Sequence, residues 1–358
     1  MNKRTTLKFR QLAVVAIAWV IAGLMMSYYD YLVLRSVGQT IQGEYHFNGL
    51  AIAVNAGTGL VGALLGGSFL VFYVNEKFRD KPYWYTVFSI AFFFLFVVMV
   101  ISSIKYFLLS GKNEYSYLSI SEIVFNIDSG KLKNIITWFV VVCLTQLLLQ
   151  MNSRMGGSYF GSLFHGRYNI PREERKVFMF LDLNSSTTIA ESLGDERYHE
   201  LLRDFFADIA NPILESSGNI YQYVGDEVVV VWDYDDGIRQ SRCVNCFFEI
   251  KRQVEANRGR YLKKYGLVPT FKAGFHSGKV IAGQVGTLRR EITYSGDVLN
   301  TTSRMLGMCK EFGVEVITSR ILLSELCLDK TFEVLQLGSL RLRGKEQEIV
   351  LNGIRPRE

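Results

Sequence analysis

The sequence predicts an α-helical bundle of four membrane spans, followed by an α+β domain with a ferredoxin-like order of elements. Long apolar runs occupy the first 150 residues, whereas the remainder has the composition of an ordinary soluble domain. In that remainder, short apolar runs of strand character alternate with stretches of helical periodicity. The chain has 358 residues, 49% of them hydrophobic, which suffices for two or three domains.

The four apolar stretches approach the length of about 20 residues that a membrane-spanning helix needs. They run from Leu12 to Leu34, from Leu50 to Val74, from Trp84 to Leu109 and from Ile135 to Leu149. The first stretch lacks a small-residue cleavage site after a short apolar core, so we interpret it as an anchor rather than a signal peptide. We therefore expect a four-helix transmembrane domain over residues 1–150.

Basic residues are unevenly distributed around these stretches. Lys and Arg are more frequent before the first stretch, between the second and third, and after the fourth than in the other two loops. The positive-inside rule then places both termini in the cytoplasm of a multi-pass protein of the cell (inner) membrane. In the second stretch, Gly62-x-x-x-Gly66 predicts a close helix-packing face, within or between chains. Whether the domain binds an unknown ligand or partner in the lipid bilayer is left open by these residues.

Charge and cysteine content narrow the function classes. The net charge of +6 is modest and the basic residues are dispersed, which argues against nucleic-acid binding. The five cysteines lack the spacing of a disulfide framework. Cys243 and Cys246 have no second pair that would complete a zinc site, so we interpret them as packing residues one helical turn apart. The C-terminal half therefore suits a reducing compartment.

A juxtamembrane linker rich in glycine, serine and arginine is expected over residues 151–175, and a cytosolic domain over 176–358. Strands of that domain are expected over residues 176–183, 219–224, 227–233, 270–276, 280–285, 292–294 and 314–318, with short strands in the tail to 354. Helices are expected over residues 186–209, with a candidate break at Gly194, and over 238–265 and 298–312. Strand, helix, hairpin, helix, strand is the ferredoxin-like order, with helices packed on one sheet.

Two aspartates stand where predicted strands end. Asp182 closes the apolar run VFMFLDL and is followed by the small, hydroxyl-rich NSSTT, while Asp226 lies at the hairpin tip in VGDE. An acid that ends a buried strand lies at a sheet edge beside free backbone N–H groups. Two such acids can hold two divalent ions around a triphosphate. The pattern therefore predicts an enzyme that acts on a nucleoside triphosphate.

Four segments carry a family resemblance: FLDLNSSTT, YVGDE, KAGFHSGKVIAGQVG and YSGDVLNTTSRM. Over residues 176–354 they resemble the catalytic domain of class III nucleotidyl cyclases, in that family's order and spacing. The resemblance implies that a ribose 3′-hydroxyl attacks the α-phosphorus and that pyrophosphate leaves. It also implies two divalent cations, Mg²⁺ or Mn²⁺, as cofactors. It does not extend to the first 150 residues.

The resemblance assigns a role to several side chains. Asp182, Leu183 and Asp226 are expected as metal ligands. Asn300 and Arg304, spaced four residues apart on one helix, are expected to be catalytic, the first orienting the ribose and the second stabilising transition-state charge. Phosphate contacts are expected from the backbone N–H groups of Asn184, Ser185, Ser186 and Thr187, and from Lys345 with Arg343 as its local competitor.

Base recognition is assigned by the resemblance to Gln222 and Thr293. Thr293 suits adenine because its hydroxyl can accept a hydrogen bond from the exocyclic amine. Gln222 stands where adenylate cyclases usually carry lysine, and its amide can donate to adenine N1 or, when flipped, accept from guanine. The acid and the small or thiol residue typical of guanylate cyclases are absent from these positions. ATP is therefore favoured over GTP as the substrate.

In this family the two halves of a site come from different subunits. The metal aspartates and Gln222 of one subunit would then face the Thr293, Asn300 and Arg304 side chains of another. Because the chain has one copy of every element, we expect a homodimer with two equivalent sites. The function predicted is that of a membrane-bound adenylate cyclase.

Three other interpretations stay open. A guanylate cyclase differs only in the base that it binds. A diguanylate cyclase shares the ferredoxin-like core and a G-G-D/E-E-F turn, which residues 224–228 partly match, but Val224 replaces the first glycine and the Asn300–Arg304 pair has no counterpart there. A membrane receptor with a catalytically dead cyclase-like domain is compatible with Gln222, but the two metal aspartates oppose it.

Overall fold

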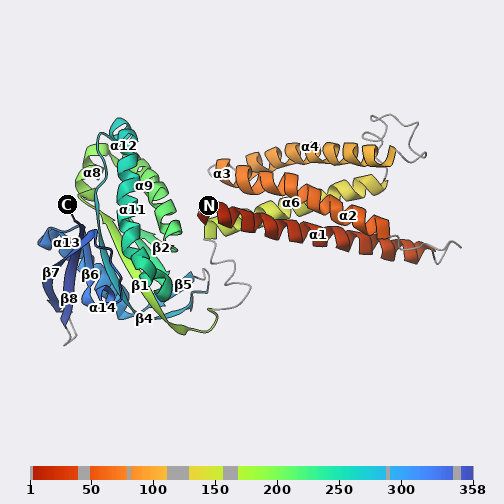
Figure 1. Ribbon diagram of the computed structural model, residues 1–358. Coiled ribbons are helices and arrows are strands. Elements are labelled where there is room, and N and C mark those ends of the chain that lie inside the picture. The colour runs from red at the N-terminus through yellow and green to blue at the C-terminus, as the bar shows by residue number, and fades with distance from the viewer. Residues whose placement is uncertain are drawn as a thin grey trace. The chain divides into compact units, whose positions relative to one another are not determined.

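The computed structural model describes residues 3–38, 49–78, 81, 83–110, 129–155, 168–287, 291–341 and 348–357. By its internal contacts the chain divides into two compact units, mainly residues 5–165 and 166–358. In Figure 1 the first is coloured red to yellow and the second green to blue.

The N-terminal unit is a bundle of helices. Its elements are α1 (Lys3–Gly38), α2 (Gly49–Gly62), two π-helical stretches η1 (Ala63–Gly67) and η2 (Phe69–Val74), α3 (Asn75–Lys77), α4 (Tyr83–Ser110) and α6 (Ser129–Met155). Within the described residues, three helices are long and apolar enough to cross a membrane: Lys3–Val33, Ile52–Lys77 and Leu132–Asn152. The remaining predicted span corresponds to a shorter apolar stretch of α4, Trp84–Val100.

Three glycines of the second apolar stretch, Gly59, Gly62 and Gly66, pack against Trp19 of α1. A Cβ built on Gly59 would lie 2.6 Å from the Trp19 carbonyl oxygen, and one on Gly66 would lie 3.4 Å from the indole. Trp19 is 3% exposed, and its Nε1–H donates to Thr145 Oγ1 of α6 at 2.9 Å. The small residues therefore serve close packing within the chain, because only glycine lets the two backbones approach so closely.

The C-terminal unit is built on one mixed sheet of eight strands (Figure 1). Its path runs β2-β3-β1-β4-β6-β8-β7, and β5 pairs with β4 off this path. The strands are β1 (Arg172–Leu183), β2 (Asn219–Val224), β3 (Glu227–Asp233), β4 (Phe271–Val285), β5 (Glu291–Ser295), β6 (Val316–Ser319), β7 (Phe332–Arg341) and β8 (Glu348–Pro356). All neighbours are antiparallel except β4 and β6.

Helices cover both faces of this sheet. They are α8 (Ser186–Leu193), α9 (Asp195–Glu215), α10 (Tyr234–Ile238), the 3₁₀ turn η3 (Arg239–Ser241), α11 (Arg242–Ala256), α12 (Arg258–Tyr265), α13 (Asp297–Phe312) and α14 (Arg320–Leu323). Along β1, Val177 and Met179 face the core formed with α9 and α11, whereas Phe178 and Phe180 face the core formed with α13. The alternation follows from the two-residue repeat of a strand, and it buries both faces.

Glycine and left-handed residues decide where the predicted helices end. The helix expected over residues 186–209 breaks at Gly194, as predicted, because that residue adopts φ +75°. The single helix expected over residues 238–265 is wrong: Gln240 and Ser241, at φ +54° and +52°, separate α10 from α11, and Asn257 separates α11 from α12.

The two strands expected over residues 270–276 and 280–285 are one strand, β4. Its whole length pairs with β1 or β5, so the intervening Ser-Gly-Lys is not a turn. Gly278 is required instead by packing, because a Cβ there would lie 2.6 Å from Val298 Cγ2 of α13.

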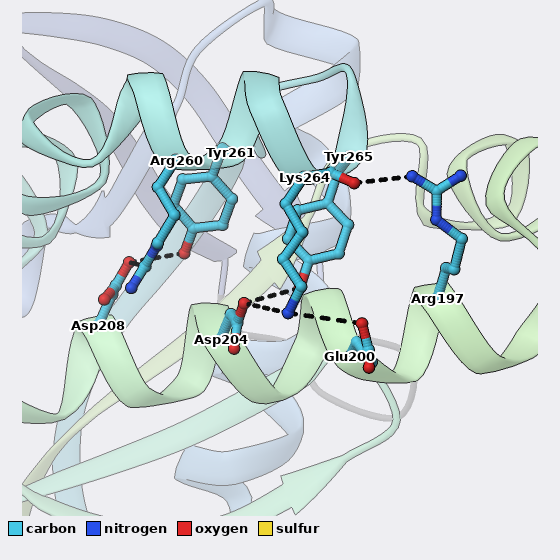
Figure 2. Close-up of polar contacts among 8 residues, drawn as sticks. All are labelled: Arg197, Glu200, Asp204, Asp208, Arg260, Tyr261, Lys264 and Tyr265. Carbon is cyan, nitrogen blue, oxygen red and sulfur yellow. Dashed lines mark hydrogen bonds and ion pairs between the residues drawn. The ribbon is translucent and has the colours of Figure 1, made fainter.

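A polar cluster joins α9 to α12 (Figure 2). The hydroxyl of Tyr261 donates to Asp208 and that of Tyr265 donates to Asp204, each at 2.7 Å. Further contacts of this α9–α12 cluster join Lys264 to Asp204 and Glu200, Arg260 to Asp208, and the Arg197 guanidinium to the Lys264 carbonyl. Acids at i and i+4 on α9 thus meet tyrosines at the same spacing on α12, which fixes the register of the two helices.

Candidate active site

Three strands bring four charged side chains to one end of the sheet. Asp182 lies near the end of β1, and its Cα partners are Glu227 in β3 and Lys272 in β4. Asp226 occupies the turn just before Glu227, after Gly225 with φ +65°. The two aspartates that the sequence singles out are therefore brought together, because β1 pairs directly with the hairpin strand β3.

Lys272 is a member of this site that the sequence analysis missed. Its Nζ lies 3.0 Å from Asp182 Oδ2, and the two side chains are only 21% and 23% exposed. The segment KAGFHSG contains this lysine, but only the pairing of β1 with β4 shows that it opposes Asp182.

Negative charge is concentrated at this end of the sheet. Burial and the nearby Asp226 raise the pKa of Asp182, while the hydrogen bond from Lys272 opposes the shift. Burial also raises the pKa of Glu227 to about 6, and the carboxylates of Asp182 and Asp226 add to that shift. The neighbouring acids thus disfavour ionisation of Asp182 and Glu227, so a cation bound among these carboxylates is stabilised.

The turn after β1 leads directly into α8. The Asn184 backbone N–H already donates a hydrogen bond to the Thr270 carbonyl at 2.8 Å, and Ser185 adopts φ +55°. Ser186 begins the helix, where the first N–H groups lack partners within the helix. Of the four predicted phosphate donors, this leaves Ser185, Ser186 and Thr187 as N–H groups at a helix N-terminus beside the acids.

Tyr198 of α9 is a second residue that the sequence analysis missed. Burial raises the pKa of its hydroxyl, as do the charges of Asp226 and Asp182, and a hydrogen bond with the Ser186 side chain opposes the shift. The ring also packs against the large core between the sheet and α9. Tyr198 therefore lies between that core and the start of α8.

The remaining predicted residues lie on other elements. Gln222 is exposed on β2, and Thr293 lies on β5 with its Oγ1 donating to the Gly283 carbonyl at 3.4 Å. Asn300 and Arg304 lie on the exposed face of α13, opposite Met305 and other buried residues of the same helix. Arg343 and Lys345 lie outside the described residues.

The donor set at Asp182 and Asp226 fits a magnesium-type ion. Hard carboxylate oxygens suit Mg²⁺ and Mn²⁺, and Mg²⁺ is often held by one or two carboxylates while substrate phosphates complete its coordination. Among the described residues, no group of three or more His, Cys, Asp or Glu side chains is placed to hold a metal by itself. A bound ion would thus need further oxygens, from the backbone beside Asp182 or from the substrate.

A sequence model of the adenylate and guanylate cyclase catalytic domain matches residues 169–352. This chain belongs to the adenylate and guanylate cyclase family. The family resemblance predicted from the four segments is thereby confirmed, as is the class III cyclase fold of the C-terminal unit.

Individual relatives point the same way. "Adenylate cyclase 2" of Rhizobium meliloti (strain 1021) is 38% identical over 204 residues, which cover 57% of this chain and 56% of the relative. "Adenylate cyclase" of Anabaena cylindrica is 25% identical over 179 residues, covering 49% of this chain and 36% of the relative. The match thus spans about half of the first relative's length. A solved bacterial light-regulated adenylyl cyclase has the same fold, with a TM-score of 0.54 at 18% identity over 64% of this chain and 66% of that chain.

Proposed function

We propose that the protein is a membrane-bound adenylate cyclase that converts ATP to 3′,5′-cyclic AMP and pyrophosphate. One observation carries the proposal: Asp182 and Asp226 converge beside the N-terminus of α8, with Lys272 against them. The acids can bind the metal ions of a metal–triphosphate complex, and the helix N-terminus and the lysine can bind its phosphates. The similarity to adenylate cyclases supports ATP as the nucleotide.

Asp182 and Asp226, with Leu183 contributing backbone, are the residues proposed to hold two divalent cations, Mg²⁺ or Mn²⁺. Such ions lower the pKa of the attacking 3′-hydroxyl and neutralise charge on the leaving pyrophosphate. Lys272 would turn from Asp182 toward the phosphates once a cation replaces it, because the lysine loses its charge partner and gains another. Ser186 and Thr187 would donate backbone N–H groups to the same phosphates.

The site is completed, in this proposal, by a second copy of the chain. Asn300 and Arg304 lie on an exposed face of α13, where they are accessible to a neighbouring subunit. Large apolar side chains are also exposed on the β2–β3 hairpin and on β4, including Tyr223 at 49%, Val224 at 51% and Val285 at 60%. A homodimer would bury these side chains and place Arg304 on the triphosphate bound to the other subunit.

Adenine selection would rest on Thr293 and Gln222. Since the Thr293 hydroxyl donates its proton to the Gly283 carbonyl, its lone pairs remain available to accept from the exocyclic amine of adenine. Guanine presents a carbonyl at that position, which would meet only lone pairs. Gln222 would donate its amide N–H to adenine N1.

The N-terminal unit is proposed as a four-helix anchor over residues 1–150, with both termini and the catalytic domain (residues 176–358) in the cytoplasm. Three helices long and apolar enough to cross a bilayer support the anchor. The uneven distribution of Lys and Arg supports the orientation.

Mixing two inactive variants tests the proposal. Asp182→Ala and Arg304→Ala should each abolish cyclic AMP formation in the full-length protein. Co-expressed in equal amounts, they should restore roughly a quarter of the wild-type rate, because about half of the dimers are mixed and each mixed dimer has one intact site. Asp182→Ala with Asp226→Ala is the matched control without rescue, since both damage the same half-site.

The outcomes separate the alternatives. Rescue in the first mixture alone supports a site shared between subunits. If both mixtures form cyclic AMP only at the background rate, the shared site is refuted. Wild-type turnover of GTP but not ATP would refute the adenylate assignment, and turnover of neither with Mg²⁺ or Mn²⁺ would indicate a catalytically inactive receptor.

A further inference from the structure

The segment that leads into β1 packs against the strand beside Thr293. The Tyr168 carbonyl accepts a hydrogen bond from the Gln284 N–H of β4 at 3.0 Å. Pro171 lies against buried Gly283, where an added Cβ would be 3.3 Å from three Pro171 atoms. We call residues 168–176 the connector segment. It reaches β4 at the two positions that pair with β5 residues Thr293 and Ile292.

A first, short series of contacts leads from the connector segment to Thr293. Pro171 touches Gly283, and the Gly283 carbonyl accepts the Thr293 hydroxyl hydrogen bond. A displacement of Pro171 against Gly283 would shift this carbonyl, and with it the direction in which the Thr293 lone pairs point. Because a hydrogen bond weakens steeply with misalignment, a small displacement is enough to affect recognition of a base.

A second path leads from the same segment to β2. Lys176 is 4% exposed and forms an ion pair with Glu174 at 2.8 Å and another with Asp233. Although burial lowers the pKa of Lys176, its hydrogen bonds to Asp233 and Glu174 raise the value overall, so the lysine is held as a cation. Its Nζ lies 5.8 Å from the centre of the Tyr294 ring, within the range of a cation–π contact.

Tyr294 passes this contact on to the strand that carries Gln222. Its backbone N–H donates to the Tyr221 hydroxyl at 3.4 Å, and the two rings meet edge to face with centroids 5.0 Å apart. Tyr221 is the residue before Gln222 on β2. Thr293 is thus linked to the connector segment through Gly283, and Gln222 is linked to it through Tyr221 and Tyr294.

We propose that the connector segment is a positioning element for base recognition, which sets the orientation of Thr293 and Gln222. The proposal rests on the proposed cyclase function. In this proposal the connector segment acts on the affinity for the base and on the choice between ATP and GTP. The metal aspartates lie elsewhere, since Asp182 is ten residues along β1 from Arg172, roughly 30 Å of strand.

The test uses Gly283→Ala and Tyr221→Phe in the full-length protein in lipid nanodiscs. The first inserts a methyl group against Pro171, and the second removes the acceptor of the Tyr294 N–H while keeping the ring. Gly259→Ala, in open space on α12, and Tyr261→Phe, which loses the hydroxyl hydrogen bond to Asp208 of α9, are the matched controls. The measurements are kcat and KM for ATP and for GTP, the Mn²⁺ dependence, and hydrogen exchange of residues 291–295.

We expect both test variants to raise the KM for ATP by about three- to tenfold, the effect of one lost hydrogen bond, and to narrow the preference for ATP over GTP. The Mn²⁺ dependence should not change, hydrogen exchange in β5 should accelerate, and the controls should match the wild type. A fall in kcat with unchanged KM and base preference would overturn the proposal, as would unaltered kinetics and exchange. Should the wild type turn over no nucleotide, the cyclase function fails by itself, and exchange in β5 still decides whether the connector holds that strand.

Discussion

In the proposed mechanism, Lys272 occupies a carboxylate oxygen that a catalytic cation would need, so replacing this lysine should separate metal binding from nucleotide binding. Lys272→Met keeps the length of the side chain and removes its charge. The cation would no longer have to displace an ammonium group from Asp182, whereas the triphosphate would lose a positive partner. We therefore expect opposite changes: tighter binding of the metal alone and weaker binding of the metal–ATP complex.

The geometry sets the size of the first change. Unit charges at the 3.0 Å separation of Lys272 Nζ and Asp182 Oδ2 attract by about 1.4 kcal/mol at a dielectric constant near 80, and by about 5.5 kcal/mol at one near 20. Both side chains are about one-fifth exposed, and ordering a lysine costs entropy, which places the net value near the lower end, at about 1–2 kcal/mol. The metal alone should then bind about 5- to 30-fold more tightly to the variant.

Calorimetric titration of the nucleotide-free protein with Mn²⁺ at pH 8 measures this change, since the carboxylates with raised pKa values are ionised there. The matched control is Lys279→Met, on the same strand, whose lysine pairs with Glu173 at 2.7 Å and is 73% exposed. It should leave the Mn²⁺ affinity unchanged. Weaker Mn²⁺ binding by Lys272→Met than by the control would refute the competition between lysine and metal.

Three further predictions concern folding and specificity. Although burial opposes it, the hydrogen bonds from Tyr265 and Lys264 hold the pKa of Asp204 below its usual range. The ionised Asp204 therefore contributes its full stabilisation above the unfolded pKa near 3.8, and this contribution is lost as the pH falls through the lower folded pKa. Asp204→Asn should cost about 1–3 kcal/mol of unfolding free energy at pH 7, and it should weaken the dependence of thermal stability on pH in the acid range. Gly194→Ala should cost about 1–3 kcal/mol through backbone strain alone, because φ +75° with ψ 159° is a conformation that glycine adopts almost exclusively and no atom lies within 4 Å of the added methyl. Gly259→Ala in α12 should not destabilise the protein in the same unfolding assay. Gln222→Lys should keep or raise the preference for ATP over GTP in a competition assay; a switch toward GTP contradicts the adenine assignment.

Local signals account for the elements that the sequence predicted well. The hairpin β2–β3 has the predicted boundaries because two apolar runs flank a Gly-Asp tip, and glycine supplies the positive φ of the turn. Where the prediction failed, a contact between elements distant in the sequence determines the local structure. Nothing around Gly278 distinguishes a turn from a strand until Val298 of α13 is packed against it.

The same distinction holds at the site. Asp182 and Asp226 could be identified from sequence because the first lies at the end of a strand pattern and the second at the tip of a hairpin pattern. Lys272 could not, since it lies 90 residues after Asp182 and joins it only through the pairing of β1 with β4. Sequence patterns reveal residues whose role follows from their own element, and miss those whose role follows from a partner strand.

The connector segment is a further example of a role that its own sequence pattern does not reveal. Its composition marks the end of a linker, and a passive tether would serve equally well at the level of sequence. In the fold it begins β1, forms a hydrogen bond to β4 through Tyr168 and buries Lys176 against Tyr294. A buried cation is costly unless its partners stay in place, so Lys176 ties the positions of Glu174 and Asp233 to that of β5. In our proposal, a displacement of the connector segment therefore shifts β5, the strand of Thr293, and this coupling makes the connector segment a determinant of base specificity.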